Sequence, residues 1–406
     1  MKSIPANHCL VALGAAALVC SAPLGAADFT VHEWGTFTSV SGSDGRLLPG
    51  LEVEEEPLPA FVHSHAGVPP ANKGWDRPVA NVTIKMETPV LYFYSDAARA
   101  VRIDVGFHGG SISQWYPERI AGETLPADVP LSSTPGNGFG LASLPAIDFA
   151  RGFEGSVSWR VDVLPAAAPD KISAPREWET PQWPRARIAG ANRVRGPGGE
   201  VEGFVFYRGI GNFSPPLRVT GDNAGRVRLE NTGRDRIPFV FIYDRRPSWD
   251  RNDAMVWWHG ALAAGESHAE LTLQSFHGGP ARKIREETLP AALMAAGLNR
   301  AEADALLATW RESYFERPGL RVFWIVPRAF TDAVLPLTIT PRPERLERVL
   351  VGRTEVLTPQ FEAELQRGFA ADGGKRWETD RYFRAYRERV RQRGSAVGVA
   401  PASAAP

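Results

Sequence analysis

The strongest constraint on the fold of this chain is an alternation of apolar and polar side chains that recurs along it. Residues 100–107 set Val, Ile, Val and Phe at every second position, with Arg and Asp between them. Residues 155–164 and 268–276 alternate in a similar way. A period of two is typical of a β-strand with one buried face. Such strands, separated by turn-rich segments, predict a mainly β protein with one or two antiparallel β-sandwich domains.

Changes in composition suggest how the chain is divided. Past residue 280, Asn299 followed by Glu302 forms a capping-box sequence, which predicts a helix running to about Tyr314. The β-rich part is therefore followed by a helical C-terminal portion. We expect a leader at 1–27, a first β-rich domain at 28–164, an irregular Pro-rich connection at 165–199, a second β-rich domain at 200–280, a helix-containing portion at 281–393 and a disordered tail at 394–406.

The two β-rich domains share a short motif. The four residues Phe-His-Gly-Gly occur at 107–110 and again at 276–279, each time after an alternating strand. Duplication of one β-sandwich is one explanation. Chance is the other, because Gly-Gly after a strand is common.

The leader has the features of a secretory signal. Lys2 provides a positive start, residues 9–19 are apolar, and Gly-Ala-Ala at 25–27 offers small residues before a cut at Asp28. The apolar run is shorter than the ~20 residues that span a bilayer. A short anchor and a lipoprotein attached through Cys20 are the alternatives. We expect a periplasmic or secreted bacterial protein without a transmembrane segment in its mature chain.

Cysteine content and charge exclude several kinds of chemistry. Cys9 and Cys20 both lie in the leader, so the mature chain would have no thiol for disulfides, nucleophilic catalysis or metal binding. The 46 basic and 46 acidic residues balance, which argues against a nucleic-acid partner. No P-loop, G-x-S-x-G elbow or dinucleotide motif occurs, so we expect no nucleotide cofactor.

Histidines and carboxylates gather near the mature N-terminus. His63 and His65 are two residues apart, so in a strand they would share a face. With His32 and Glu54 they could hold Zn, Cu or Fe, and Glu33 could act as a general base. An ordinary exposed loop, kept extended by flanking prolines, is the competing interpretation of residues 52–70. The sequence thus favours a divalent metal held by His32, His63, His65 and Glu54.

Two classes of function follow. The leading one is an exported metal-dependent enzyme, a hydrolase or oxidoreductase of unknown substrate. The alternative is a non-catalytic β-sandwich module that binds envelope carbohydrate, another small molecule or a protein partner through exposed aromatic side chains. Trp115, Trp178 and Trp183, each close to a carboxylate, are its candidates, because tryptophan faces stack on sugar rings.

Three strings carry a resemblance to a known family. VHEWGTFTSV at 31–40, METPVLYFY at 86–94 and RVFWIVP at 321–327 are similar to signatures of a family of exported bacterial proteins of unknown function. The resemblance covers most of the mature chain. It implies an exported context and assigns no catalytic residue.

Overall fold

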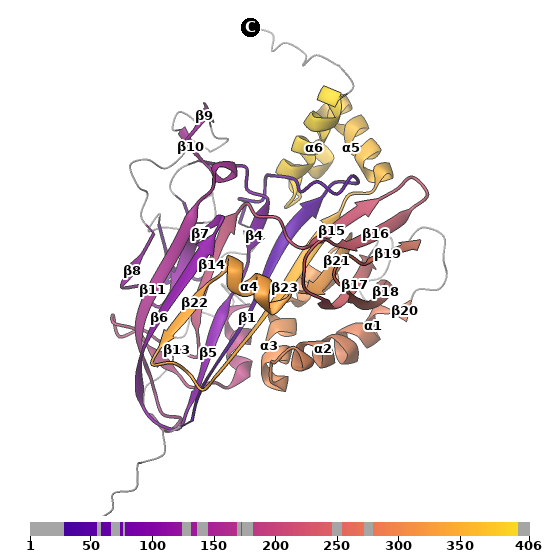
Figure 1. Ribbon diagram of the computed structural model, residues 1–406. Coiled ribbons are helices and arrows are strands. Elements are labelled where there is room, and N and C mark those ends of the chain that lie inside the picture. Colours follow the sequence, from indigo (N-terminus) through magenta and orange to yellow (C-terminus); the bar gives the residue numbers. More distant parts are fainter. Residues whose placement is uncertain are drawn as a thin grey trace, which may run out of the picture.

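A long central β-sheet organises the molecule (Figure 1). The computed structural model describes residues 28–54, 58–65, 74–75, 78–123, 131–135, 145–168, 172, 182–245, 254–271 and 279–396. The predicted leader and residues 397–406 lie outside these ranges. In the described part, strands predominate and most helical segments lie in the C-terminal third, which confirms the predicted mainly β class.

The central sheet takes its strands from distant parts of the chain. From one edge to the other its strands are β2 (His63–Ser64), β7 (Gly110–Tyr116), β14 (Val205–Gly211), β5 (Val90–Ser95), β1 (Phe29–Ser41), β23 (Arg345–Val356), β21 (Gly319–Ile325), β17 (Ile237–Arg245), β18 (Met255–Leu262) and β20 (Gly279–Pro280). The short β4 (Ile84–Met86) continues the position of β5 between β1 and β14.

Strand β1 lies in the middle of this sheet and is buried along nearly its whole length. It pairs antiparallel with β5 and parallel with β23, from Thr30 opposite Arg345 to Ser41 opposite Val356. The parallel pair departs from a purely antiparallel sandwich. Because side chains alternate along β1, the odd-numbered residues face one side of the sheet and the even-numbered residues face the other.

Two smaller groups of strands cover the face of the odd-numbered β1 residues. One contains β22 (Leu337–Thr340), β6 (Arg99–His108), β11 (Glu154–Val163), β8 (Ala121–Gly122), β12 (Val194–Arg195) and β13 (Val201–Glu202). The other contains β15 (Leu217–Gly221), β16 (Arg226–Asn231) and β19 (Ser267–Leu271). Both contribute to one hydrophobic core, which also holds Val31 and Phe37 of β1. Between them lies the short helix α4 (Arg328–Val334) (Figure 1).

Helical segments cover the opposite face. These are η2 (Trp183–Ala189), α1 (Ala281–Lys283), η3 (Ile284–Thr288), α2 (Leu289–Ala295), α3 (Arg300–Trp310) and η4 (Arg311–Glu316). They enclose a second core with Trp34 and with those aromatic side chains of β5, β14, β17 and β21 that face the helices: Tyr92, Phe206, Phe241, Tyr243 and Phe323. The predicted capping box is confirmed: the Asn299 side chain accepts from the Glu302 N–H, and Glu302 accepts from the Asn299 N–H.

A third core lies at the end of β1. Helices α5 (Pro359–Asp372) and α6 (Phe383–Ala396), with η5 (Lys375–Trp377) between them, pack there against Val40 and Ile210. Helix α6 extends three residues into the expected disordered tail. The small sheet of β3 (Val79–Ala80), β10 (Pro145–Asp148) and β9 (Leu131–Pro135), with η1 (Phe149–Arg151), completes the described elements.

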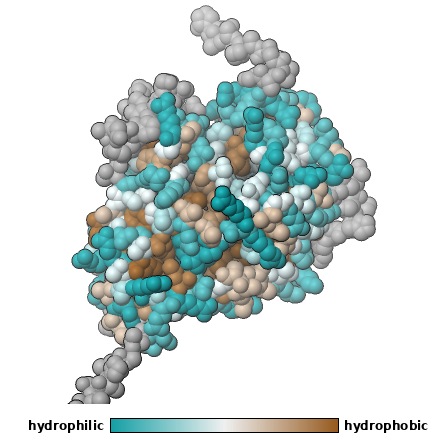
Figure 2. Space-filling model, in the orientation of Figure 1, coloured by the Kyte–Doolittle hydropathy of each residue, from teal (hydrophilic) through white to brown (hydrophobic). Residues whose placement is uncertain are grey.

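The alternating pattern of residues 100–107 is confirmed, because β6 buries its four apolar residues and leaves the residues between them more exposed. The first Phe-His-Gly-Gly motif forms the turn from β6 to β7, where His108 is exposed. Residues 276–278 of the second lie outside the described part, so duplication stays a prediction. Among the described helices, none is long and apolar enough to cross a membrane. Figure 2 shows a largely hydrophilic surface with separate hydrophobic patches on the face that carries α4.

Candidate functional site

His32 belongs to the helix-covered face and contacts helix α3. Its Nδ1 lies 2.9 Å from Glu302 Oε2 and 3.0 Å from Glu302 Oε1. Tyr94 of β5 donates its hydroxyl to the same carboxylate at 2.6 Å. Because an ionised carboxylate only accepts, Nδ1 of His32 carries the proton. The buried Nε2 of His32 has no hydrogen-bond partner among the described residues.

Glu33 faces the other side of β1, as expected for its neighbour in a strand. Its carboxylate accepts from Tyr207 at 2.7 Å and from Arg348 Nε at 2.6 Å. Burial alone would lower the pKa of Arg348, but the adjacent Glu33 carboxylate overcomes this and raises it. Burial, with Glu33 next, also raises the pKa of Tyr207. Glu33 is therefore occupied in neutralising a buried arginine, an arrangement that its prediction as a general base did not anticipate.

His63 and His65 lie at the edge strand β2 and use different partners. His63 Nε2 is 2.6 Å from Glu200 Oε1. His65 stacks on Trp75 at 4.1 Å between ring centres, and its Nε2 lies 3.4 Å from Glu123. Although the two histidines are close in sequence, they contact different carboxylates.

Glu54 makes an ion pair with an arginine. Its Oε1 lies 2.7 Å from Arg208 Nη2, and Glu87 Oε2 lies 3.0 Å from the same nitrogen. The structure thus gives His32, His63, His65 and Glu54 four different sets of partners. Over the described ranges, no three His, Cys, Asp or Glu side chains are grouped to hold a metal ion. The shared metal site stays a prediction.

Sequence reasoning missed a stripe of buried charge that crosses the helix-covered face. It runs across β14, β4, β1, β23 and β21, and the side chains that form it are Arg208, Lys85, Arg353 and Arg321, with Glu54, Glu87 and Glu355. Burial would raise the pKa of Glu355, but Arg321, Arg353 and Arg381 together lower it. The charged residues Arg353 and Glu355, two positions apart in the buried half of β23, were the signal available in the sequence.

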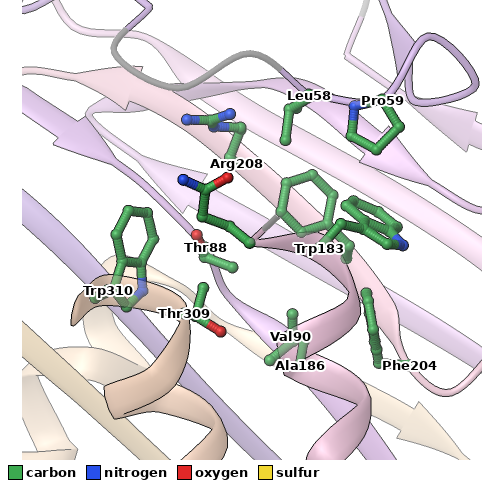
Figure 3. Close-up of a pocket in the computed structure, with 12 residues that line it drawn as sticks. Leu58, Pro59, Thr88, Val90, Trp183, Ala186, Phe204, Arg208, Thr309 and Trp310 are labelled. Atoms are coloured by element: carbon green, nitrogen blue, oxygen red, sulfur yellow. The ribbon is translucent and has the colours of Figure 1, made fainter. Parts of the chain in front are cut away.

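A pocket lies at the β14 end of this stripe, between the central sheet, η2 and α3 (Figure 3). Its cavity volume is about 40 Å³, and the pocket widens into an open mouth. Its walls are mainly aromatic and aliphatic, and Thr88, Gln182, Arg208 and Thr309 contribute polar groups. The lining residues are Leu58, Pro59, Thr88, Val90, Gln182, Trp183, Ala186, Phe204, Phe206, Arg208, Thr309 and Trp310.

The polar atoms of the pocket differ in what they already bind. Trp183 Nε1 donates to Glu202 at 2.9 Å, and Thr309 Oγ1 donates to the carbonyl of Ala305 at 2.7 Å. Trp310 Nε1 is buried and has no hydrogen-bond partner in the described part of the chain. The pocket therefore combines aromatic walls with an unsatisfied buried donor on Trp310.

The sequence predicted that Trp115, Trp178 and Trp183 would be exposed, and the structure corrects this prediction for Trp115 and Trp183. Trp115 and Trp183 are each only 6% exposed, because Trp115 packs in the sandwich core and Trp183 in the helix-covered core. Trp178 lies outside the described residues. Trp183, which the sequence placed on an exposed face, instead lines the wall of the pocket.

Comparisons with known proteins add no function. No family model matches this chain, and no curated protein matches it. Among solved structures, it is similar to the yeast delta-COP-I mu-homology domain complexed with Dsl1 WxWxV peptide, with 8% identity and a TM-score of 0.24, over 81% of this chain and 96% of that chain. So low a TM-score supports no conclusion about fold or function, and the site must be interpreted from its own chemistry.

Proposed function

We propose that this protein binds a compact, mainly apolar, ring-shaped molecule in the pocket between β5, β14, η2 and α3. The observation that carries the proposal is the composition of the pocket walls. Trp183, Phe204, Phe206 and Trp310 supply four aromatic rings around one recess. Pockets for small ligands are typically concave and apolar, with a few placed polar groups.

The proposal agrees with the chemistry of the pocket. A two-ring ligand that buries about 200 Å² of apolar surface would gain about 5 kcal/mol at ~25 cal/mol per Å². A gain of about 5 kcal/mol corresponds to a dissociation constant of about 0.2 mM, and losses of translational and side-chain freedom reduce this gain, so we expect dissociation constants of about 0.2 mM or weaker. Stacking against the aromatic rings would add to affinity for a flat ligand.

The proposed ligand is a small molecule that the protein encounters outside the cytoplasm. The predicted secretory leader and the family resemblance support a periplasmic or secreted location. This proposal keeps the binding class expected from the sequence but replaces an exposed aromatic face by an internal recess.

The proposal is tested with 2-acetonaphthone as the probe. Isothermal titration and quenching of tryptophan fluorescence would measure its binding to the full chain. Ala186 lines the pocket on η2, so Ala186→Leu adds volume inside the recess and should weaken binding at least tenfold.

The matched control is Ala189→Leu, which adds the same volume to the same helix at a buried position that does not line the pocket. It should leave the affinity within about twofold of the wild type. Equal loss in both variants, or no binding by the wild type, would reject the proposal. Thermal melts of both variants ensure that folded proteins are compared.

A metal-dependent enzyme is the second candidate, and one observation favours it. His32 is held by a carboxylate through Nδ1 and has its Nε2 without a partner among the described residues. Metal-ligating histidines commonly have this arrangement, in which a carboxylate orients the ring. Elemental analysis of the purified protein should then find Zn, Cu or Fe at stoichiometric level. His32→Gln should remove it, and His259→Gln, at an exposed histidine, should not.

A further inference from the structure

We infer that the ligand of the aromatic pocket is uncharged and carries a hydrogen-bond-accepting oxygen on the edge of its ring, which Trp310 recognises through its indole N–H. This inference rests on the proposed function and specifies the chemical class of its ligand. Two independent observations support it: an unsatisfied donor in the wall and the charge balance around Arg208.

The donor is the indole N–H of Trp310. The side chain is 3% exposed, and Nε1 has no hydrogen-bond partner in the described structure. Indole nitrogen donates and never accepts, so its only possible partner is an acceptor. A buried donor without a partner costs free energy, which a ligand oxygen would recover.

The direction of this donor suits the pocket. Figure 3 shows the nitrogen of Trp310 on the side of the ring toward Thr309, which also lines the recess. Trp183 on the other wall has its own N–H bonded to Glu202, so it offers only its ring. A ligand that stacks between the walls would therefore present its acceptor toward α3.

The charges at the end of the pocket argue against an anionic ligand. Arg208 is the pocket's only charged lining residue within the described structure. It already contacts the carboxylates of Glu54 at 2.7 Å and Glu87 at 3.0 Å. An incoming carboxylate would approach the guanidinium alongside these two carboxylates, and like charges repel strongly where water is excluded. A ketone, ether or amide oxygen avoids this repulsion.

Three probes of similar shape test separately the need for an acceptor oxygen and the effect of a negative charge. 2-Acetonaphthone has a neutral acceptor, 2-ethylnaphthalene lacks the acceptor, and 2-naphthoate carries a negative charge at neutral pH. Dissociation constants are measured for the wild type and for Trp310→Phe, which keeps an aromatic ring and removes the N–H. Comparing ratios between the two proteins cancels the different water solubilities of the probes.

For each protein, the dissociation constant of 2-ethylnaphthalene is divided by that of 2-acetonaphthone. This ratio should be about five- to tenfold smaller in Trp310→Phe than in the wild type, as expected for one lost hydrogen bond. 2-Naphthoate should bind the wild type more weakly than 2-acetonaphthone. An unchanged ratio, or tighter binding of 2-naphthoate, would overturn the inference. If no probe binds at all, the proposed function itself fails, so the two failures differ.

A measurement on the wild type covers the case in which Trp310→Phe does not fold. In protein labelled with nitrogen-15 at its indoles, the assigned Trp310 N–H resonance should move downfield with 2-acetonaphthone and change little with 2-ethylnaphthalene. Equal shifts with both probes would also overturn the inference.

Discussion

Nδ1 of His32 lies 2.9 Å from the carboxylate of Glu302, a contact that joins residues 270 positions apart in the chain. The same Glu302 closes the capping box of α3 and accepts from Tyr94. One carboxylate thus fixes the start of a helix, the central strand and the neighbouring strand to each other. Since the other end of α3 contributes Thr309 and Trp310 to the pocket, this contact also positions a pocket wall.

Replacing Glu302 by Ala should destabilise the fold by about 3 kcal/mol, because it leaves the buried His32, the Tyr94 hydroxyl and the Asn299 N–H without their acceptor. Chemical denaturation measures the change. Asp304→Ala on the same helix breaks only an exposed pair with Arg300 and should cost less than about 1 kcal/mol. Similar losses in the two variants would contradict this role for Glu302.

Stability should fall in alkaline solution, and Tyr94 should contribute to the fall. Burial, followed by the Glu302 carboxylate, raises the pKa of Tyr94 far above its ordinary value. Unfolded tyrosine ionises near pH ~10, so above this pH the unfolded chain releases a proton that the folded protein keeps. The stabilisation is complete below pH ~10 and is lost as the pH rises toward the folded pKa.

Tyr94→Phe tests this pH dependence. Urea denaturation from about pH 8 to about pH 11 should give a shallower decline for the variant, by at most about 1.4 kcal/mol per pH unit. Parallel curves would show that Tyr94 does not carry the effect.

The ion pair of Glu33 and Arg348 should behave as a unit. Arg348→Met alone leaves the buried Glu33 carboxylate without its cation and should cost about 3–5 kcal/mol. Adding Glu33→Gln should recover at least half of that loss, because the uncompensated charge disappears. Arg345→Met, from an exposed pair with Glu347, is the control and should change stability by less than about 1 kcal/mol.

Gly209 of β14 should not tolerate a side chain. A Cβ at this position would overlap the backbone oxygen of Ser111 in β7, and a backbone atom cannot move aside as a flexible side chain can. Gly209→Ala should lower stability by more than about 2 kcal/mol and separate β14 from β7. Gly203→Ala, whose Cβ would meet nothing closer than Arg187 at 4.0 Å, should be nearly neutral.

Local features of this protein were predictable from sequence, and distant pairings were not. The alternation in β6 and the capping box of Asn299 and Glu302 depend on residues within a few positions of each other. A short stretch of sequence is therefore enough to predict them. The opposite directions of His32 and Glu33 follow in the same way from strand geometry.

The partners of these side chains depend on which strands and helices meet, which no short string specifies. His32 meets Glu302 and Glu33 meets Arg348 only because β1 lies beside β23 and beneath α3. The sequence grouped His32, His63, His65 and Glu54 by their closeness along the chain. The fold instead gives each of them a partner from a different part of the chain. It builds its pocket from segments that had shown no common motif.

The parallel pairing of β1 with β23 has a consequence for how the protein folds. The strand formed by residues 29–41 cannot complete its central position until residues 345–356 are present, so the sheet closes only when nearly the whole chain is available. Contacts of such long sequence separation slow folding, because the loop must close before the contacts stabilise it. A chain released before residue 345 would carry an open strand edge in mid-sheet, ready to pair with another molecule.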